Sequence, residues 1–565
     1  MKYLTTFLIT FLIIITVSAQ QIAIRNVNLI DVKTGKVLFG QSVLISDKTI
    51  SRVVSDKKLK VDAETNVIDA EGKYLMPGLV DGHVHLGLSG SLYSNPRWVD
   101  FEQRISYREE HEQSPHNSAD YLHRYLRLAI TSVMDIGGPF ENFIIRDSIS
   151  TATPSPNVWM AGPLFSTIEQ PDPAIIKVAS KEDIDKLFNK LLPKTPDFIK
   201  IWYQAPSELP AEETYPLIRR IGELCKKHGL KLVVHAHELN TARLAVESGA
   251  NTLAHSIIDG IIPDDFIKTL KDKEVTYIPT LAVYKKIGES LSGQLAHHPH
   301  DLAWANPFNY ATLTDIEAMD TLTIPKGIKM LRNKEIHPPF HGADSIGKIN
   351  LKKVAQGGVR IATGTDAGMF GVFHASSYLQ ELEEMSDAGL SNAEILEAAT
   401  INAAFGYGKD NLIGNIEKGK LADMILLAEN PLESIENLNT IELIFKNGKI
   451  IKPDTIINES PEAVVQRQVN AVNARDIDAF LDTYAEDVEI YDSSGKLLMK
   501  GHEQMRERYG PGFKTPNIYL QIENRIVHGN TVIDKEKIRA GEKIIRAIVV
   551  YEVVDGKIKK SIHYY

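Results

Sequence analysis

The sequence of 565 residues contains a single cysteine, Cys225. One thiol cannot form a disulfide within the chain, and it cannot supply a cluster of thiolate ligands for a metal. A metal site here would therefore use histidine, carboxylate or a less usual ligand. Cys225 lies in the helical pattern RRIGELCKKHGL, and we interpret it as a small buried apolar residue.

Positive charge is also in the minority. The chain has 63 lysines and arginines against 73 aspartates and glutamates, which gives a formal net charge of -10. No long basic run is present, so nucleic acid is excluded as the main partner. At about 100–200 residues per domain, the length predicts two to four domains.

Long apolar runs are missing apart from one near the start, from Leu4 to Val17. Lys2 precedes this run, and Val17-Ser18-Ala19 offers a small-residue cleavage site. The run is too short to favour a membrane-spanning helix, although an uncleaved anchor is the alternative. We predict that residues 1–19 are a signal peptide, that the protein is exported to the periplasm or the extracellular space, and that no membrane attachment remains after cleavage.

The rest of the chain divides by its hydrophobic pattern. Residues 20–74 and 413–458 are rich in strands and are each too short to close a core, so we expect them to pair as one composite β-sandwich. Between them, residues 75–412 alternate strand-like and helical stretches, which predicts a parallel α/β domain of the (β/α)8 TIM barrel type. The eight candidate strands are residues 78–85, 131–135, 157–161, 197–203, 231–235, 252–255, 276–279 and 360–364.

Residues 461–565 have a different pattern. Two helical stretches are followed by strands rich in Val, Ile and Tyr, which predicts an α+β domain. The segments VNARDIDAF, YAEDV and YEVVDGKIKKSIHYY resemble nuclear-transport-factor-like (SnoaL-like) cone domains. The resemblance favours dimerisation or ligand contact over a second active site, so a homo-oligomer through this domain is expected.

Histidines stand at the end of the first apolar strand, in the segment MPGLVDGHVH. Side chains alternate along a strand, so His83 and His85 project from the same face and could form half of a metal site. Polar residues also follow later candidate strands, in the contexts DFIKI (Lys200), LVVHAH (His235), TLAHS (His255) and ATGTDAG (Asp366). Groups at the carboxyl ends of parallel strands converge, so these residues are expected to meet.

These motifs resemble, in order and residue type, those of the amidohydrolase superfamily, of the binuclear branch related to prolidase and imidazolonepropionase. The resemblance covers about residues 21–452. It implies two divalent metal ions, and Zn²⁺ is the ion that this ligand chemistry favours most. It also implies that Asp366 is both a metal ligand and the catalytic base. The implied ligands are His83, His85, Lys200, His235, His255 and Asp366.

Lys200 needs a separate account, because an ammonium group cannot bind a cation. Burial in an apolar strand lowers the pKa of a lysine and makes the free amine accessible. The amine can then add carbon dioxide, and the resulting carbamate can bridge two metals. The alternative is a lysine whose ammonium group reaches solvent or pairs with an acid.

Four further residues lie beside these motifs and are candidates to face the substrate: Tyr203, His237, Glu238 and His374. Each could equally be a packing residue. Residues 86–120 and 281–345 are insertions after the first and seventh candidate strands, and both could cover a site. We interpret the histidines at positions 297, 298 and 300 as a solvated surface segment.

The sequence thus predicts an exported hydrolase that cleaves C–N bonds with a metal-bound hydroxide, most like an Xaa-Pro dipeptidase. Its expected substrate is a small molecule, a short peptide or a cyclic amide. One alternative is a lactone- or phosphoester-cleaving hydrolase with the same site. Another is a non-catalytic binding protein that works through its cone domain.

Overall fold

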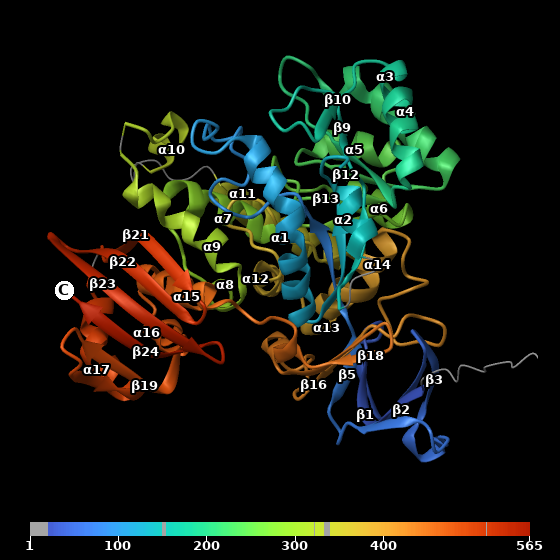
Figure 1. Ribbon diagram of the computed structural model, residues 1–565. Helices are drawn as coiled ribbons and strands as arrows, with labels where there is room; N and C mark the ends of the chain where they lie inside the picture. Colours follow the sequence, from blue (N-terminus) through green and yellow to red (C-terminus); the bar gives the residue numbers. More distant parts are fainter. Residues whose placement is uncertain (1–20, 150–153, 321, 333–339, 516) are drawn as a thin grey trace, which may run out of the picture.

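The computed structural model describes residues 21–149, 154–320, 322–332, 340–515 and 517–565. The predicted signal peptide lies outside these residues. The chain forms a curled β-sheet, a central domain of parallel strands and helices, and a C-terminal α+β domain (Figure 1). Within the described residues, no helix is both long enough and apolar enough to cross a bilayer.

The curled sheet combines the segment that precedes the central domain in the sequence with the segment that follows it. Its eight strands run in the order β18-β17-β16-β5-β1-β2-β3, with β4 also paired to β1. The bounds are β1 (Gln21–Asp31), β2 (Lys36–Ser46), β3 (Thr49–Ser55), β4 (Asn66–Asp69), β5 (Tyr74–Pro77), β16 (Met424–Leu427), β17 (Ile441–Lys446) and β18 (Lys449–Ile451). A bridge between Thr49 and Leu421 folds the sheet back on itself around an apolar core. The expected sandwich is therefore one continuous sheet.

The central domain contains all eight candidate strands, and two further short strands follow the third. The bounds are β6 (Leu79–Val84), β7 (Ile130–Asp135), β8 (Asn157–Met160), β9 (Leu164–Ser166), β10 (Ile175–Lys177), β11 (Phe198–Trp202), β12 (Lys231–His235), β13 (Thr252–Ala254), β14 (Thr276–Ile278) and β15 (Arg360–Ile361). All adjacent pairs are parallel.

These strands form two sheets rather than the single closed eight-stranded ladder that was expected. One sheet is β6-β7-β8 and the other is β10-β9-β11-β12-β13-β14-β15. Gly162, with a φ of 74°, and Pro163 separate β8 from β9, and β9 is the strand that pairs with β11. At the other edge, backbone hydrogen bonds join β6 to the segment after β15, from Gly82 N to Thr363 O (3.0 Å) and from Asp366 N to His83 O (2.8 Å).

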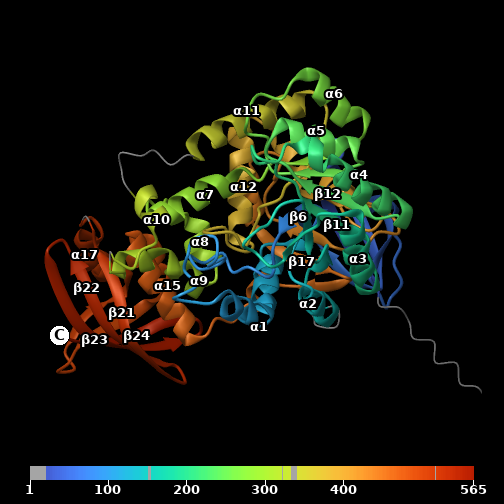
Figure 2. The same ribbon diagram turned by 90° about the horizontal axis from the view of Figure 1, so that it is seen from above.

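Helices surround the parallel strands (Figure 2). Those between β6 and β14 are α1 (Tyr107–Arg127), α2 (Asn142–Ile149), α3 (Lys181–Leu191), α4 (Ala211–His228), α5 (Leu239–Glu247) and α6 (Asp264–Asp272). Those after β14 are α7 (Leu281–Ser292), α8 (Pro299–Trp304), α9 (Pro307–Ala311), α10 (Lys326–Leu331), α11 (Phe340–Gln356), α12 (Ser376–Asp387), α13 (Asn392–Glu397) and α14 (Ala403–Gly406). A local sequence signal explains the start of α13, where Ser391 and Glu394 form a capping box. Cys225 is buried in α4, and burial raises the pKa of its thiol to about 12.

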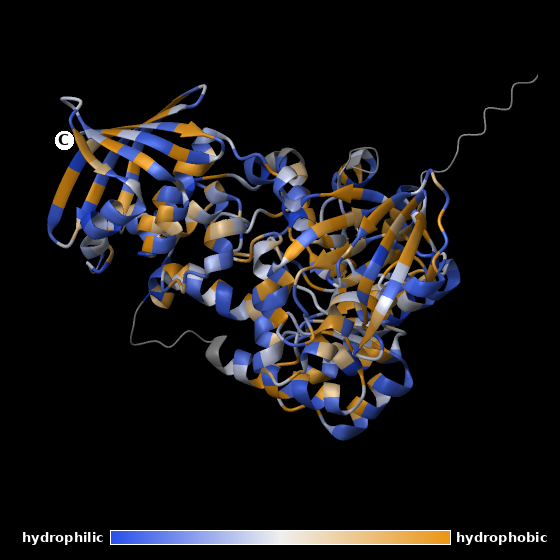
Figure 3. Ribbon diagram, turned by 90° about the horizontal axis from the view of Figure 1, so that it is seen from below, coloured by the Kyte–Doolittle hydropathy of each residue, from blue (hydrophilic) through white to orange (hydrophobic). Residues whose placement is uncertain are grey.

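In the C-terminal domain, three described helices pack against one face of a sheet with the strand order β20-β19-β24-β23-β22-β21. Its elements are α15 (Pro461–Ala474), α16 (Ile477–Asp482), β19 (Tyr484–Asp492), β20 (Leu497–Lys500), α17 (Gly501–Phe513), β21 (Tyr519–His528), β22 (Thr531–Ala540), β23 (Lys543–Val554) and β24 (Lys557–Tyr564). Apolar and polar residues alternate along the strands (Figure 3), so one face forms a core of its own.

The insertion after β14 carries the C-terminal domain. Arg467 of α15 donates hydrogen bonds to the carbonyls of Leu302 (2.7 Å) and Ala305 (2.8 Å), and Asn470 donates to Pro307 (2.8 Å). Leu302 and Ala305 lie at the carboxyl end of α8, where carbonyls lack partners within the helix, and Pro307 is the first residue of α9. The insertion of residues 281–345 thus holds the C-terminal domain in place and also lies beside the strand ends.

The histidines at positions 297, 298 and 300 are half-buried, so their interpretation as a solvated surface segment is wrong. His297 Nδ1 contacts the hydroxyl of Tyr310 at 2.5 Å. His298 Nε2 lies 3.0 Å from Glu383, and the His298 ring stacks on that of His300 at 5.1 Å between centroids. Packing against α12 and α9 explains why this polar cluster is not exposed.

Candidate metal centre

A cavity of about 370 Å³ lies at the carboxyl ends of the parallel strands. The strands place polar side chains there directly: His83 is in β6, Lys200 is in β11 and His235 ends β12. All six residues predicted as metal ligands line this cavity, namely His83, His85, Lys200, His235, His255 and Asp366. The ends of the parallel strands therefore bring these side chains to one place, as predicted.

The first group of ligand atoms comes from β6 and the segment after β15. The Nε2 atoms of His83 and His85 each lie 3.1 Å from Asp366 Oδ1. The atoms of this trio lie within 4.8 Å of one another, which is close enough to hold one metal ion. Burial favours the protonated carboxyl of Asp366, but the adjacent imidazoles outweigh it and hold the pKa of Asp366 well below its usual range.

The second group consists of His235, His237 and His255, whose ring nitrogens also lie within 4.8 Å of one another. The ring centroids of His235 and His255 are 4.4 Å apart, and those of His237 and His255 are 4.7 Å apart. Burial lowers the pKa of all three imidazoles, so they are neutral and able to bind a cation. His237, expected only to face substrate, therefore also has the position of a possible ligand.

Lys200 lies in the wall of the same cavity and is 1% exposed. Its Nζ atom has no hydrogen-bond partner among the described residues. Burial lowers the pKa of the Lys200 ammonium to about 7, although Asp366 opposes the shift. A large share of this lysine is therefore a neutral amine near neutral pH, which is the form that reacts with carbon dioxide.

Hydrogen bonds behind the ligands orient them. His85 Nδ1 lies 2.7 Å from the carbonyl of Gly137, which leaves Nε2 free for a metal. His255 Nδ1 lies 2.9 Å from the hydroxyl of Thr280, with the same effect. Asp366 and His255 also have left-handed backbones, with φ of 62° and 77°. Both conformations are uncommon for residues other than glycine.

Asp81 connects the two backbone segments that carry the first group of ligands, β6 and the segment after β15. Its carboxylate accepts hydrogen bonds from the backbone N–H groups of His83 (3.2 Å) and Thr365 (3.1 Å) and from the Thr365 hydroxyl (2.7 Å). Burial raises the pKa of Asp81 to about 7. This role of Asp81 was not predicted, although Asp81 stands in the VDGHVH segment itself.

The structure does not support a substrate-facing role for three of the four flanking candidates. The Tyr203 hydroxyl points to the carbonyl of Ala211 at 2.7 Å, and Tyr203 is absent from the described lining residues. His374 Nε2 lies 2.8 Å from the carbonyl of Leu88, and Glu238 is the N-cap residue of α5. A substrate contact of these three residues therefore stays a prediction, without support from the cavity lining.

Eleven of the described lining residues were not predicted, and four of these carry a polar group. Tyr284 of α7 contacts His237 through its hydroxyl, 3.1 Å from Nε2. Trp202 stacks on His235 with ring centroids 4.1 Å apart, and Trp98 meets Trp202 edge to face at 5.5 Å. Gln204 completes the set. The only available signal was general: Trp98 and Tyr284 lie in the two insertions expected to cover the site.

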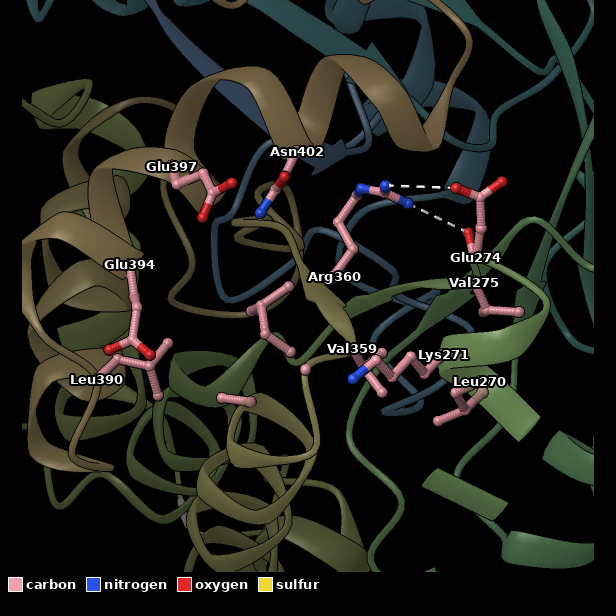
Figure 4. A pocket seen from close by; sticks show the side chains of 13 residues that line it. Leu270, Lys271, Glu274, Val275, Val359, Arg360, Leu390, Glu394, Glu397 and Asn402 are labelled. Atoms are coloured by element: carbon pink, nitrogen blue, oxygen red, sulfur yellow. Dashed lines mark hydrogen bonds and ion pairs between the residues drawn. The ribbon is translucent and has the colours of Figure 1, made fainter. Parts of the chain in front are cut away.

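Another cavity, of about 430 Å³, lies near the amino ends of β14 and β15 (Figure 4). Arg360 points toward Glu274, with contacts of 3.4 Å to its carbonyl and 4.0 Å to its carboxylate. Its guanidinium also stacks on Phe405 at 3.5 Å. Glu394, another lining residue, is occupied in the capping box of α13. Arg360 and Glu394 are therefore already engaged with other groups of the protein.

The chemistry of the first cavity differs from this, because its buried polar atoms lack partners. Neither ring nitrogen of His235 and neither of His83 makes a hydrogen bond with a described residue, since the 3.1 Å approach of His83 to Asp366 lacks hydrogen-bond geometry. Buried polar atoms without partners are costly and call for an explanation such as an ion. The donor set of neutral imidazole and carboxylate fits divalent metal ions.

Comparison with known proteins gives consistent matches. Residues 74–451 match the amidohydrolase family, and residues 465–561 match the SnoaL-like domain. A 5-methylthioadenosine/S-adenosylhomocysteine deaminase of Caldanaerobacter subterraneus subsp. tengcongensis is 22% identical over 484 residues, covering 80% of this chain and 95% of that protein. An imidazolonepropionase of Brevibacillus brevis is 24% identical over 452 residues, covering 73% and 89%.

Among solved structures, that of an Xaa-Pro dipeptidase with bound methionine in the active site superposes with a TM-score of 0.59. It is 21% identical, and the match covers 77% of this chain and all of that one. At this identity the likeness concerns the fold alone.

Proposed function

This chain belongs to the amidohydrolase family, and from that premise we propose that it is a metal-dependent hydrolase of amide C–N bonds in small molecules or short peptides. The observation that carries the proposal is the pair of buried ligand groups in one cavity, with Lys200 in the same wall. Sequestration of a ligand would require neither a second group of imidazoles nor an unpaired buried lysine.

The residues divide into two ligand groups. His83, His85 and Asp366 would hold one divalent ion, and His235 and His255 would hold the other, with Zn²⁺ the ion that suits these donors best. We propose that Lys200 carries a carbamate that bridges the two. The neutral amine adds to carbon dioxide and loses a proton, which replaces an unpaired buried donor by an anion between cations. When bound, the ions activate water and polarise the scissile carbonyl.

Asp366 is the proposed base. Its carboxylate is held ionised by its neighbours, so it can accept a proton from the attacking water. The proton then passes to the amide nitrogen, which must be protonated to leave as an amine. Asp81 and Thr365 keep this carboxylate in place through the backbone on either side of it.

The test combines metal analysis with a substrate panel. Purified protein is expected to contain close to two divalent ions per chain and to lose activity when a chelator removes them. The panel should include Xaa-Pro dipeptides, the substrates most expected from the sequence, together with neutral amides, a lactone and a phosphoester. Turnover confined to the lactone or the phosphoester would contradict amide hydrolysis.

We also propose that the protein is exported. The support is the N-terminal sequence with Lys2, the apolar run and the small residues before Gln20. Expression in cells followed by N-terminal sequencing of the mature protein tests this, with a new terminus expected at position 20. Recovery of chains that begin at Met1 in the membrane fraction would contradict it.

A homo-oligomer through the C-terminal domain is the remaining proposal. The outward face of its sheet carries a row of apolar residues that pair in register across four strands, Ile526, Ile533, Val550 and Ile562. Ile526 is 59% exposed, and Ile548 on the same face is 46% exposed. Light scattering should give a dimer for the native chain and a monomer for Ile548→Lys; a monomeric native chain would contradict the proposal.

A further inference from the structure

The described lining of the metal cavity separates into a polar part and an apolar part. Histidines, Lys200 and Asp366 occupy the strand ends, whereas the other walls come from the segments that follow the strands. Val283, Ile287 and Leu291 form one stripe of α7 because they are spaced four residues apart. The remaining apolar residues are Trp98, Val99, Leu164, Trp202, Met369 and Phe370.

These walls carry no charge among the described lining residues. Histidines aside, the charged side chains of the cavity are Lys200 and Asp366, and both belong to the metal centre. Away from it, the polar groups are those of Gln204 and Tyr284, which are neutral. The Gln204 carbonyl accepts a 3.4 Å hydrogen bond from Gln170, which leaves its amide N–H groups able to donate.

A free dipeptide brings an ammonium and a carboxylate into such a site. Burying a charge against apolar walls without a partner is strongly unfavourable. An uncharged amide avoids this cost and gains from burial of an apolar group between the indoles and α7. The indole Nε1 atoms of Trp98 and Trp202 also lack acceptors among described residues, so these N–H groups can donate to an amide carbonyl without any charge on the ligand.

We propose that the substrate is an uncharged amide that carries a bulky apolar group, which packs between Trp98, Trp202 and the apolar stripe of α7. This proposal rests on the proposed amide hydrolysis. It replaces the expected free dipeptide by a substrate without terminal charges. The scissile carbonyl lies at the metal centre, and the apolar group occupies the walls formed by the two insertions.

Three amides of nearly equal size separate charge from shape: 4-methylacetanilide is neutral, 4-acetamidobenzoate is anionic and 4-acetamidobenzylamine is cationic. The metal-loaded protein is expected to hydrolyse the neutral compound with a kcat/KM about 100-fold above either charged one, the size of effect for an unpaired buried charge. Equal or higher values for a charged compound, or for Ala-Pro, would overturn the proposal while leaving amide hydrolysis intact.

Binding supplies a readout that does not depend on turnover. Calorimetric titration with the same three compounds should rank the neutral one first by a similar factor. If no amide or dipeptide is hydrolysed, the proposed amide hydrolysis fails, and this ranking still decides the preference for an uncharged ligand. Equal or tighter binding of a charged compound would overturn it.

A designed change of charge tests the position of the apolar group. Ile287 is half-buried in the α7 stripe, so Ile287→Lys can place an ammonium near a ligand carboxylate. This variant should lower the preference for 4-methylacetanilide over 4-acetamidobenzoate at least about 10-fold, a change of about 1.4 kcal/mol. Ile287→Met is the matched control and should keep the preference. An unchanged preference in a folded, metal-loaded Ile287→Lys protein would overturn the placement against α7.

Discussion

The metal cavity and the interior of the C-terminal domain both bury polar side chains, but they treat them differently. In the C-terminal domain Arg525 makes two 2.7 Å bonds to Asp534, and the Tyr551 hydroxyl donates to Glu536 at 2.7 Å. In the cavity, Lys200 and His235 have no such partners among described residues. A paired polar group stabilises its own fold, whereas an unpaired one marks the place of something the chain binds.

The comparison has two exceptions among the described residues of the C-terminal domain, Gln468 Oε1 and Arg539 Nε. The neighbour of the first, Gln466, bonds Asn470 at 3.0 Å and Arg525 at 2.9 Å. Two scattered unsatisfied atoms are ordinary for a domain of this size. The cavity instead gathers its unpaired imidazole and amine nitrogens in one place, which is why we assign chemistry to the cavity alone.

The largest expected effect is that of Lys200→Ala. Loss of the bridge should remove part of the bound metal and abolish activity together, and added acetate or propionate should partly restore both by supplying a carboxylate. The measurement is metal content alongside hydrolysis rate, with and without the acid. Lys446 provides the control: it is also buried, but it bonds Asn157 and Asp423, both at 2.8 Å.

Lys446→Ala should therefore lower thermal stability and leave metal content and acid response unchanged. Full metal occupancy and a near-normal rate in Lys200→Ala would mean that the amine has no bridging role. The contrast between the two buried lysines would then disappear.

Asp366→Asn should keep most of the metal and lose about 10²–10⁴-fold in kcat, the range for a proton-transfer group. Asparagine keeps the size of the side chain and tolerates the left-handed backbone of this position. Acetate should not rescue the variant, because the bridge is intact. Pre-steady-state and steady-state rates, measured with metal content, distinguish it from Lys200→Ala; a near-normal rate would assign the base to another group.

Asp534→Ala should act on stability and not on chemistry. Removing one partner of a buried ion pair costs about 3–5 kcal/mol, because Arg525 is left without its carboxylate. Chemical denaturation should show a less stable C-terminal transition, while kcat per folded, metal-loaded chain stays unchanged. A comparable loss of kcat would show that this domain takes part in the reaction.

The smallest expected effect is that of Glu536, whose protonation makes the stability of the C-terminal domain depend on pH. Burial raises the pKa of Glu536 from 4.5 to about 7. The folded state therefore binds a proton that the unfolded state releases, so its contribution is fully present below pH 4.5 and is lost as the pH rises through 7. At about 1.4 kcal/mol per unit this amounts to at most ~3 kcal/mol.

The denaturation midpoint of the C-terminal domain should thus decrease in the native chain as the pH rises from 4.5 to 7. Glu536→Gln keeps a neutral side chain at every pH and should flatten this part of the profile. A profile that is the same in both proteins would mean that Glu536 does not titrate in this window. Residues 461–565 expressed alone should show the same profile, since they have a core of their own.

Much of the site could be predicted from the sequence, because parallel strands bring their ends together whatever the loops do. His83 and Asp366 are 283 positions apart, yet strand order alone predicted that they meet. The candidates Tyr203 and His374 had no such geometric basis, because both lie outside the strands and strand alternation does not orient them. Tyr284 could not be assigned, since its approach to His237 depends on how α7 leaves β14.

The fold shows the same limit. Strand positions were predictable from apolar runs, but the break of the third strand at Gly162 and the pairing of β9 with β11 depend on local backbone geometry. The two segments of the curled sheet were expected to pair, but their joining into one continuous sheet depends on which strands meet, including the closure of Thr49 on Leu421. Long-range closures leave no periodic signal.

The left-handed backbones of Asp366 and His255 have a consequence for how this protein can change. Each conformation costs on the order of 1 kcal/mol for a residue with a Cβ atom. Replacement of either residue by glycine would relieve that strain and remove a ligand in the same step. Selection for stability alone would therefore erode the site at these two positions, so their retention requires selection for activity. A directed-evolution experiment that rewards only thermal tolerance should lose Asp366 or His255 before the fully extended ligands of β6 and β12.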